Sequence, residues 1–261
     1  MKYIKILIKF IWYYITSKNK HAVHSPFVYN FVTNIIYNKK YNEDFEKIKL
    51  LKKKLLKSKE KINIVDFGAG SNINQSKRRQ IRDIAINSAK NEKFGKLLHR
   101  ISKYSKAQNI VELGTSLAIS TCYLAKASPS SQIYSFEGCP ETINIAKNNL
   151  AFLKIDNVTI IEGDFKVTLE NKLKKIKTVD FAFIDGNHQE IATIQYFDLI
   201  LKHSHNDTIF IFDDIYWSKG MENAWNYIKK HDKSTVTIDL FFVGIVFIKK
   251  ELSKENFKIR F

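Results

Sequence analysis

The stretch Val111–Ala125, VELGTSLAISTCYLA, decides the fold class. An apolar run that ends at Leu113 is typical of a buried strand, and a helix is expected to follow it. Gly114 allows a tight turn between the two and lets a ligand approach the backbone. The next expected strand, 132–137, ends in an acid, Glu137. A glycine turn at a helix N-terminus, with an acid at the next strand tip, predicts a site for a nucleoside-containing cofactor.

Strands and helices alternate regularly from residue 109 onward. Strands are expected at 109–113, 132–137, 158–161, 179–184, 208–213, 236–240 and 244–248, with helical segments between the first six. Only three residues separate the last two strands, which should therefore form an antiparallel hairpin. The pattern predicts an α/β fold with a doubly wound, mostly parallel seven-stranded sheet and an antiparallel C-terminal hairpin strand, preceded by a helical N-terminal section.

Composition and charge divide the chain into three expected regions. These are a basic helical section at 1–61, an accessory segment of a strand and helices at 62–108, and a cofactor-binding core at 109–261. The first region holds 15 lysines against four acidic residues and so carries most of the net charge of +17. Two cysteines in 261 residues make no disulfide framework, which favours a cytoplasmic location. Thirteen per cent aromatic residues argue against disorder.

The first fifteen residues, MKYIKILIKFIWYYI, are apolar but interrupted by lysines. As a helix they would reach about 22 Å, less than the bilayer core of about 30 Å, so they are not expected to span a membrane. Two interpretations stay open. The favoured one is a helix that packs on its own domain, and the alternative is peripheral contact of residues 1–15 with the inner membrane surface.

The glycine turn and the second-strand acid resemble those of the class I S-adenosylmethionine-dependent methyltransferases, a resemblance that covers about residues 94–250. It implies that Glu112 supports the methionine amino group, that Gly114 lies against the cofactor and that Glu137 holds the ribose hydroxyls. One departure is Ala118, where close relatives often carry glycine. The resemblance also implies cofactor contacts for Thr115, Ser116, Gly138, Asp164, Phe165 and Asp185, with the adenine bracketed by the Asp164–Phe165 pair.

A second glycine motif, Asp66–Ser71 (DFGAGS), is a closer textual match to a cofactor loop. No strand that ends in an acid follows it by about twenty residues, as a dinucleotide-type site requires. We therefore expect it to be a turn in the accessory segment.

Three carboxylates follow neighbouring strands: Asp185 after the fourth, and Asp213 and Asp214 after the fifth. Carboxylates that meet at one sheet edge repel each other unless a cation compensates, and oxygen ligands favour Mg²⁺. The arrangement resembles the cation-dependent O-methyltransferases of the catechol, caffeoyl-CoA and sugar types. That resemblance implies a metal held by the three acids, with His188 as the catalytic base beside Asp185, because histidine titrates near neutral pH. Helix capping by these acids stays an open alternative.

The function predicted from these features is methylation of a small-molecule hydroxyl, with S-adenosylmethionine as cofactor and Mg²⁺ as an additional candidate. The basic N-terminal region keeps an RNA methyltransferase as an alternative, although lysine rather than arginine supplies the charge and nucleic acid is not favoured. A protein that binds the cofactor or a membrane without catalysis is the other alternative. The acceptor and the oligomeric state are not predicted.

Overall fold

The computed structural model describes residues 2–40, 42–65, 78–87 and 91–261. The chain forms two compact units, one of residues 1–38 and 179–261 (the terminal unit) and one of residues 39–178 (the central unit). The three regions expected from the sequence, 1–61, 62–108 and 109–261, do not correspond one for one to these units and stay predictions. The glycine motif at 66–71 lies outside the described residues.

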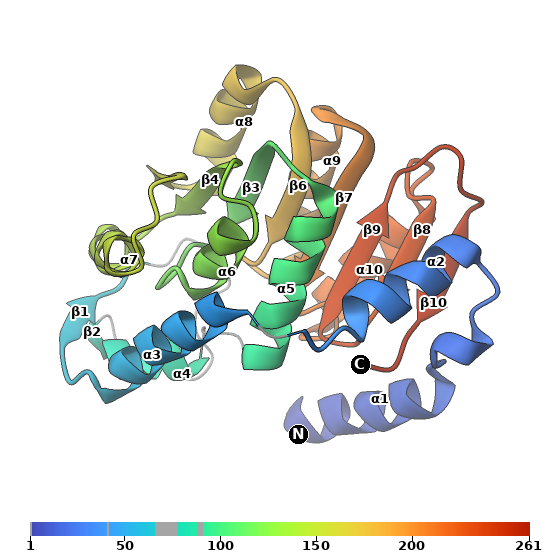
Figure 1. Cartoon of the computed structure of the whole chain (residues 1–261), viewed down its shortest axis with the longest axis horizontal. Helices are drawn as coiled ribbons and strands as arrows, with labels where there is room; N and C mark the ends of the chain where they lie inside the picture. The colour runs from blue at the N-terminus through green and yellow to red at the C-terminus, as the bar shows by residue number, and fades with distance from the viewer. Residues whose placement is uncertain (1, 41, 66–77, 88–90) are drawn as a thin grey trace. The chain divides into compact units, whose positions relative to one another are not determined.

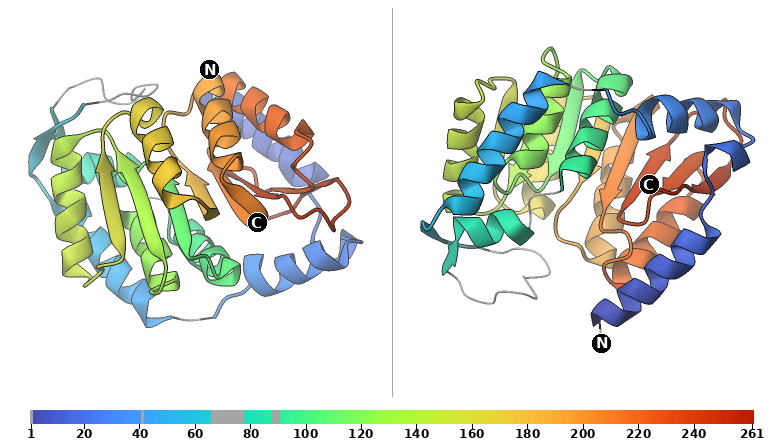
Figure 2. Two further views of the ribbon diagram at one scale, coloured as in Figure 1. Left: turned by 90° about the horizontal axis from the view of Figure 1, so that it is seen from above. Right: turned by 60° about the horizontal axis from the view of Figure 1, so that its bottom comes forward.

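The central unit contains three parallel strands in the order β3-β4-β5. They are β3 (Asn109–Leu113), β4 (Gln132–Glu137) and β5 (Val158–Glu162). The helices around them are α3 (Glu43–Lys57), α4 (Ile81–Asn87), α5 (Glu92–Ser105), α6 (Ile119–Ala127), α7 (Pro140–Phe152) and α8 (Phe165–Ile176). In Figure 2 the green and yellow strands of this unit lie side by side. β3 is buried along nearly its whole length, as expected of a strand covered on both faces.

A short antiparallel pair completes the central unit. β1 (Lys61–Asn63) pairs with β2 (Arg78–Gln80). The sequence pattern predicts a helix from residue 77 to 88, but the helix begins only at Ile81, because residues 78–80 pair with β1 instead. Strand pairing is a tertiary effect that overrides local helix propensity.

The terminal unit contains five strands in the order β10-β8-β9-β7-β6 (Figure 1). They are β6 (Val179–Ile184), β7 (Ser204–Asp213), β8 (Val236–Asp239), β9 (Val243–Phe247) and β10 (Glu255–Lys258). β6 and β7 are parallel, whereas β9 is antiparallel to both β7 and β8. Between the strands lie α9 (Glu190–Leu201) and α10 (Lys219–Lys230). The predicted antiparallel hairpin is therefore confirmed.

The N-terminal segments belong to the terminal unit. They are α1 (Lys2–Thr16), the 3₁₀ turn η1 (Lys20–Ala22), α2 (Pro26–Phe31) and the π-helical turn η2 (Val32–Ile36). Ser25 caps α2, as its sequence predicts, by accepting a hydrogen bond from the backbone N–H of Val28 at 3.5 Å. The rings of Phe27 and Phe31 both meet Phe247 edge-on at 5.0 Å, which joins α2 to β9.

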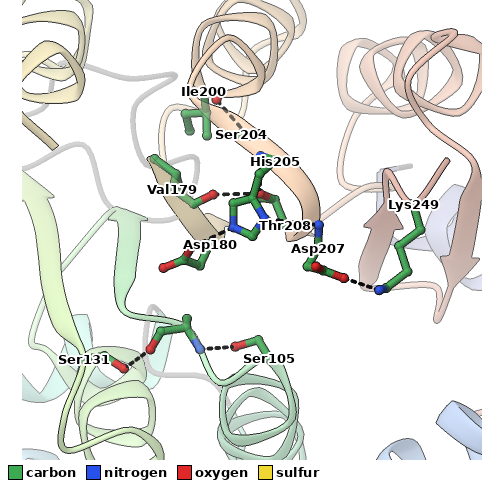
Figure 3. A network of polar contacts seen from close by, with 11 residues as sticks. Ser105, Ser131, Val179, Asp180, Ile200, Ser204, His205, Asp207, Thr208 and Lys249 are labelled. Carbon is green, nitrogen blue, oxygen red and sulfur yellow. Dashed lines mark hydrogen bonds and ion pairs between the residues drawn. The ribbon is translucent and has the colours of Figure 1, made fainter. Parts of the chain in front are cut away.

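Polar contacts fix the starting ends of β6 and β7 (Figure 3). His205 Nε2 lies 2.7 Å from Asp180 Oδ1, and the Thr208 hydroxyl donates to the Val179 carbonyl at 2.7 Å. Lys249 forms an ion pair with Asp207. The first two contacts join β6 to β7 at the end opposite to the one where Asp185 and Asp213 lie, and the ion pair joins β7 to the segment after β9.

The fold is thus mixed α/β, with a mostly parallel sheet, an antiparallel strand pair and helices on both sides. The described strands of the sheet number eight rather than the predicted seven, because β10 pairs in parallel with β8. Its residues, ENFK, show no run of apolar side chains, and three of the four are polar. β10 lies at an edge of the sheet, where a strand needs little apolar character.

Candidate active site

The turn between β3 and α6 has the backbone that the glycine predicts. Gly114 has a φ of 101°, in the region that favours glycine. Its N–H and that of Thr115 both donate to the Phe136 carbonyl at 3.0 Å, so the turn is attached to β4. Ala118, where a glycine was expected from the resemblance, has a φ of 60° and caps α6. The alanine therefore adopts the left-handed conformation that glycine would take at lower cost.

Glu112 lies fully buried beside this turn. Its Oε2 accepts hydrogen bonds from the hydroxyls of Thr121 and Ser135, each at 2.6 Å. The Ser135 oxygen is in turn 2.5 Å from the hydroxyl oxygen of Thr115. Burial raises the pKa of Glu112 to about 7, and the two hydroxyl donors oppose this shift.

Oε1 of Glu112 has no hydrogen-bond partner among the described residues. A buried carboxylate oxygen without a donor costs free energy, which a ligand cation or N–H group can recover. Oε1 is thus suited to accept a hydrogen bond from an ammonium group such as the one on the methionine part of S-adenosylmethionine. This is the role that the resemblance implies for Glu112.

Glu137 connects the glycine turn to the turn after β4. Its Oε2 accepts from the backbone N–H of Ser116 at 2.8 Å, and its Oε1 accepts from that of Cys139 at 3.0 Å. Gly138 lies between these anchors in the sequence. Each carboxylate oxygen has two lone pairs, so both can accept a further donor such as a ribose hydroxyl.

The third strand end of the central unit carries Asp164 and Phe165. Gly163, with a φ of 128°, donates its N–H to the Glu137 carbonyl at 3.0 Å and so attaches this turn to the end of β4. Asp164 caps α8 by accepting from Lys166 N–H at 2.9 Å. The Phe165 ring meets Phe136 edge-on, with centroids 6.4 Å apart. The three turns of this unit therefore share one edge of the sheet, the edge where ligands bind in open α/β folds.

The terminal unit brings Asp185 and His188 together after β6. His188 Nε2 lies 3.8 Å from Asp185 Oδ1, and both side chains are partly accessible. Asn187 and His188 have φ values of 70° and 42° in the left-handed region, which turns the loop sharply. The Asn187 amide donates to the Tyr196 hydroxyl at 3.1 Å and anchors the loop to α9.

Asp213 and Asp214 lie at the same sheet edge as Asp185, since Ile184 and Phe212 are register partners in β6 and β7. Asp213 is buried at the end of β7, and Asp214 has a φ of 53°. Among the residues that the structure describes, no three His, Cys, Asp or Glu side chains form a group that could hold a metal ion. Strand tips fix where the Cα atoms lie, but the local backbone decides the direction of each side chain. The metal site predicted at Asp185, Asp213 and Asp214 therefore gains no support from a cluster of ligands among the described residues and stays a prediction.

Two hydroxyls of the site, those of Thr121 and Ser135, were missed by the sequence reasoning. A signal for Ser135 was available, because Glu112 and Ser135 are directly opposite in the register of β3 and β4. A polar residue in an otherwise apolar strand, facing a buried acid on its neighbour, indicates a hydrogen bond.

Comparison with known proteins finds similarity to methyltransferases. Residues 111–215 match the family model of a methyltransferase domain. The described structure resembles an S-adenosylhomocysteine-bound methyltransferase from Podospora anserina, PaMTH1, with a TM-score of 0.59, 12% identity and coverage of 87% of this chain and 98% of that one. It also resembles the O-methyltransferase TomG from Streptomyces achromogenes in complex with S-adenosylmethionine, with a TM-score of 0.56, 15% identity and coverage of 85% and 95%.

A third similar structure is the O-methyltransferase from Bacillus cereus in complex with S-adenosylhomocysteine, with a TM-score of 0.50, 19% identity and coverage of 84% and 96%. No protein of curated function matches the chain by sequence. Residues 111–215 thus match a methyltransferase domain, and the fold is similar to that of methyltransferases crystallised with S-adenosylmethionine or S-adenosylhomocysteine. These findings confirm the resemblance to methyltransferases that the glycine turn and Glu137 indicated.

Proposed function

We propose that the domain transfers the methyl group of S-adenosylmethionine to a hydroxyl oxygen of a small-molecule acceptor. The observation that carries this proposal is the His188 imidazole beside the Asp185 carboxylate at the carboxyl end of β6. Histidine with a neighbouring carboxylate is a common arrangement for removing a proton from a hydroxyl. The O-methyltransferases among the similar structures support the same choice of acceptor atom.

In this proposal the central unit holds the cofactor. Glu112 Oε1 accepts from the ammonium group of the methionine part, and Glu137 accepts from the ribose hydroxyls. Gly114, Thr115 and Ser116 would present backbone rather than bulky side chains to it, and Asp164 and Phe165 would contact the adenine. When bound, the cofactor supplies a methyl group already activated by a sulfonium centre, so the chain needs only to position and deprotonate the acceptor.

The proposed base is His188. Because Nε2 of His188 is the ring nitrogen nearest to Asp185, we assign Nδ1 as the proton acceptor. Nδ1 would take the hydroxyl proton as the methyl carbon exchanges its bond to the sulfonium sulfur for one to the acceptor oxygen, with S-adenosylhomocysteine as the leaving group, and Asp185 would stabilise the resulting imidazolium. The described residues offer no group of ligands for a cation, so no step is assigned to one.

A methyl-transfer assay with ¹³C-methyl-labelled cofactor tests the proposal. The purified chain would be incubated with catechols, sugars, hydroxy acids and total RNA in separate reactions, each with and without a chelator, and NMR would locate the label. We expect an O-methyl resonance on a small-molecule product. Label only in RNA, or only on nitrogen, would overturn the choice of acceptor. Activity that a chelator abolishes and Mg²⁺ restores would overturn the assignment of the step to His188 without a cation.

A further inference from the structure

The helix α1 has two contrasting faces. The inner face packs within the terminal unit: Phe10 meets Phe241 edge-on at 5.0 Å, and Tyr13 is buried with its hydroxyl donating to the Ile259 carbonyl. Lys9 forms an ion pair with Glu222 of α10. These contacts hold α1 on the unit, in agreement with the favoured interpretation of a helix that packs on its own domain.

The outer face of α1 is apolar and exposed. Its members are each half to two-thirds exposed, and they are Ile4, Leu7, Ile8, Ile11, Trp12, Tyr14 and Ile15. At 3.6 residues per turn these positions cover one continuous face of the helix. Single exposed apolar residues are ordinary, but a continuous apolar face marks an interaction surface.

The surroundings of this face are strongly basic. Residues 1–38, the N-terminal part of the terminal unit, contain five lysines and no Asp or Glu. A cavity of about 430 Å³ next to the end of α1 is lined by residues that include Lys18, His24 and Lys258, with Glu255 as its one acid. Arg260 lies over the Tyr14 ring, 4.1 Å from its centroid. Positive charge is thus gathered where the apolar face ends.

From the apolar face and the charge around it, we infer that α1 binds the surface of an anionic phospholipid bilayer, with its outer face among the acyl chains and the lysines near the headgroups. An exposed apolar face that carries Trp and Tyr, next to a basic region, is the composition of helices that lie in a membrane interface. No helix in the described residues is long and apolar enough to cross a bilayer.

Charge favours a membrane over a second copy of the chain as the partner. Two chains that met through α1 would bring together two basic N-terminal segments with five lysines each, and like charges at an interface cost affinity. An anionic bilayer offers the opposite charge, and each lysine near its surface strengthens the attraction. The cavity beside α1 has the chemistry to receive a phosphate headgroup through Lys18 and Lys258.

Tryptophan fluorescence tests this inference with the full chain, because Trp12 is 65% exposed, whereas Trp217 is partly buried and Trp225 is buried. Vesicles of phosphatidylglycerol and phosphatidylcholine should shift the Trp12 emission to the blue, and phosphatidylcholine alone should shift it much less. Trp12→Phe should remove the shift while leaving vesicle co-sedimentation in place. The shift should weaken as salt is raised from about 0.1 to about 1 M, because salt screens the lysines.

Co-sedimentation with the same vesicles supplies the matched comparison. The double variant Ile8→Glu and Ile11→Glu should lower binding at least tenfold, whereas Ile191→Glu, at an equally exposed apolar residue of α9, should leave it unchanged. Equal binding by all three proteins would overturn the inference. So would a blue shift that appears without vesicles and grows with protein concentration, since that result would assign the face to self-association. Methyl transfer is not needed for either readout, so the two proposals can fail separately.

Discussion

The two units hold the carboxylates of the proposed site in different ways. In the central unit, Glu137 accepts two backbone N–H groups and Glu112 accepts two hydroxyls, all within 3.0 Å. In the terminal unit, Asp185 and His188 approach only to 3.8 Å, across a loop with two left-handed residues. The first arrangement is preformed for a ligand. The second has the longer distance between side chains that catalytic pairs often show before substrate binds.

The largest effect should come from the loop of the terminal unit. His188→Ala should lower the rate of methyl transfer by about 10²- to 10⁴-fold, because it removes the proton acceptor. Calorimetry with S-adenosylhomocysteine should show unchanged cofactor affinity. A matched control is His205→Ala, which removes a closer histidine–aspartate contact at the opposite ends of the strands and should spare the rate. Equal rate losses in both variants would remove His188 from the reaction.

Gly114→Val should weaken cofactor binding by about a hundredfold or more, equivalent to about 3 kcal/mol. The substitution places a branched side chain at a φ of 101° and at the backbone that the cofactor must approach. Calorimetry measures the affinity, and circular dichroism shows whether the variant is folded. A folded variant with the affinity of the parent would mean that the cofactor binds elsewhere.

The buried acid should make stability depend on pH. The pKa of Glu112 is about 7 in the folded protein and near 4.5 when exposed, so between these values only the folded state keeps the proton. The free energy of unfolding should therefore fall as pH rises from about 4.5 to about 7, by up to about 3 kcal/mol. Urea unfolding at several pH values across this range measures the free energy of unfolding. Glu112→Gln should flatten the slope, and an identical slope in both proteins would contradict the assignment.

Glu137→Ala should reduce cofactor affinity at least tenfold, the smallest of these effects. Each hydrogen bond to the charged carboxylate is worth about 1.5–3 kcal/mol, although water can replace part of it at this partly exposed position. Calorimetry with S-adenosylhomocysteine gives the ratio of dissociation constants. If Glu137→Gln binds as weakly as Glu137→Ala, charge rather than geometry is the main contribution.

The same difference between the units explains how much the sequence could predict. Strand β3, its glycine and the acid at the end of β4 lie close together in the sequence, and their backbone geometry follows from residue type, so the predicted bounds of β3 and β4 match the structure. The backbone at Asp214 is left-handed, with a φ of 53°, and no glycine in the sequence predicts that turn. β10 forms by pairing with the edge of the sheet at β8. The local sequence ENFK has no pattern that could predict this pairing.

A crystal structure of the chain with S-adenosylhomocysteine tests the central claim most directly. The account predicts that the ligand's ammonium group donates to Glu112 Oε1, which has no hydrogen-bond partner among the described residues. It also predicts that the ribose hydroxyls donate hydrogen bonds to the Glu137 carboxylate. Ligand density at the glycine motif of residues 66–71 instead, with Glu112 and Glu137 uninvolved, would contradict it.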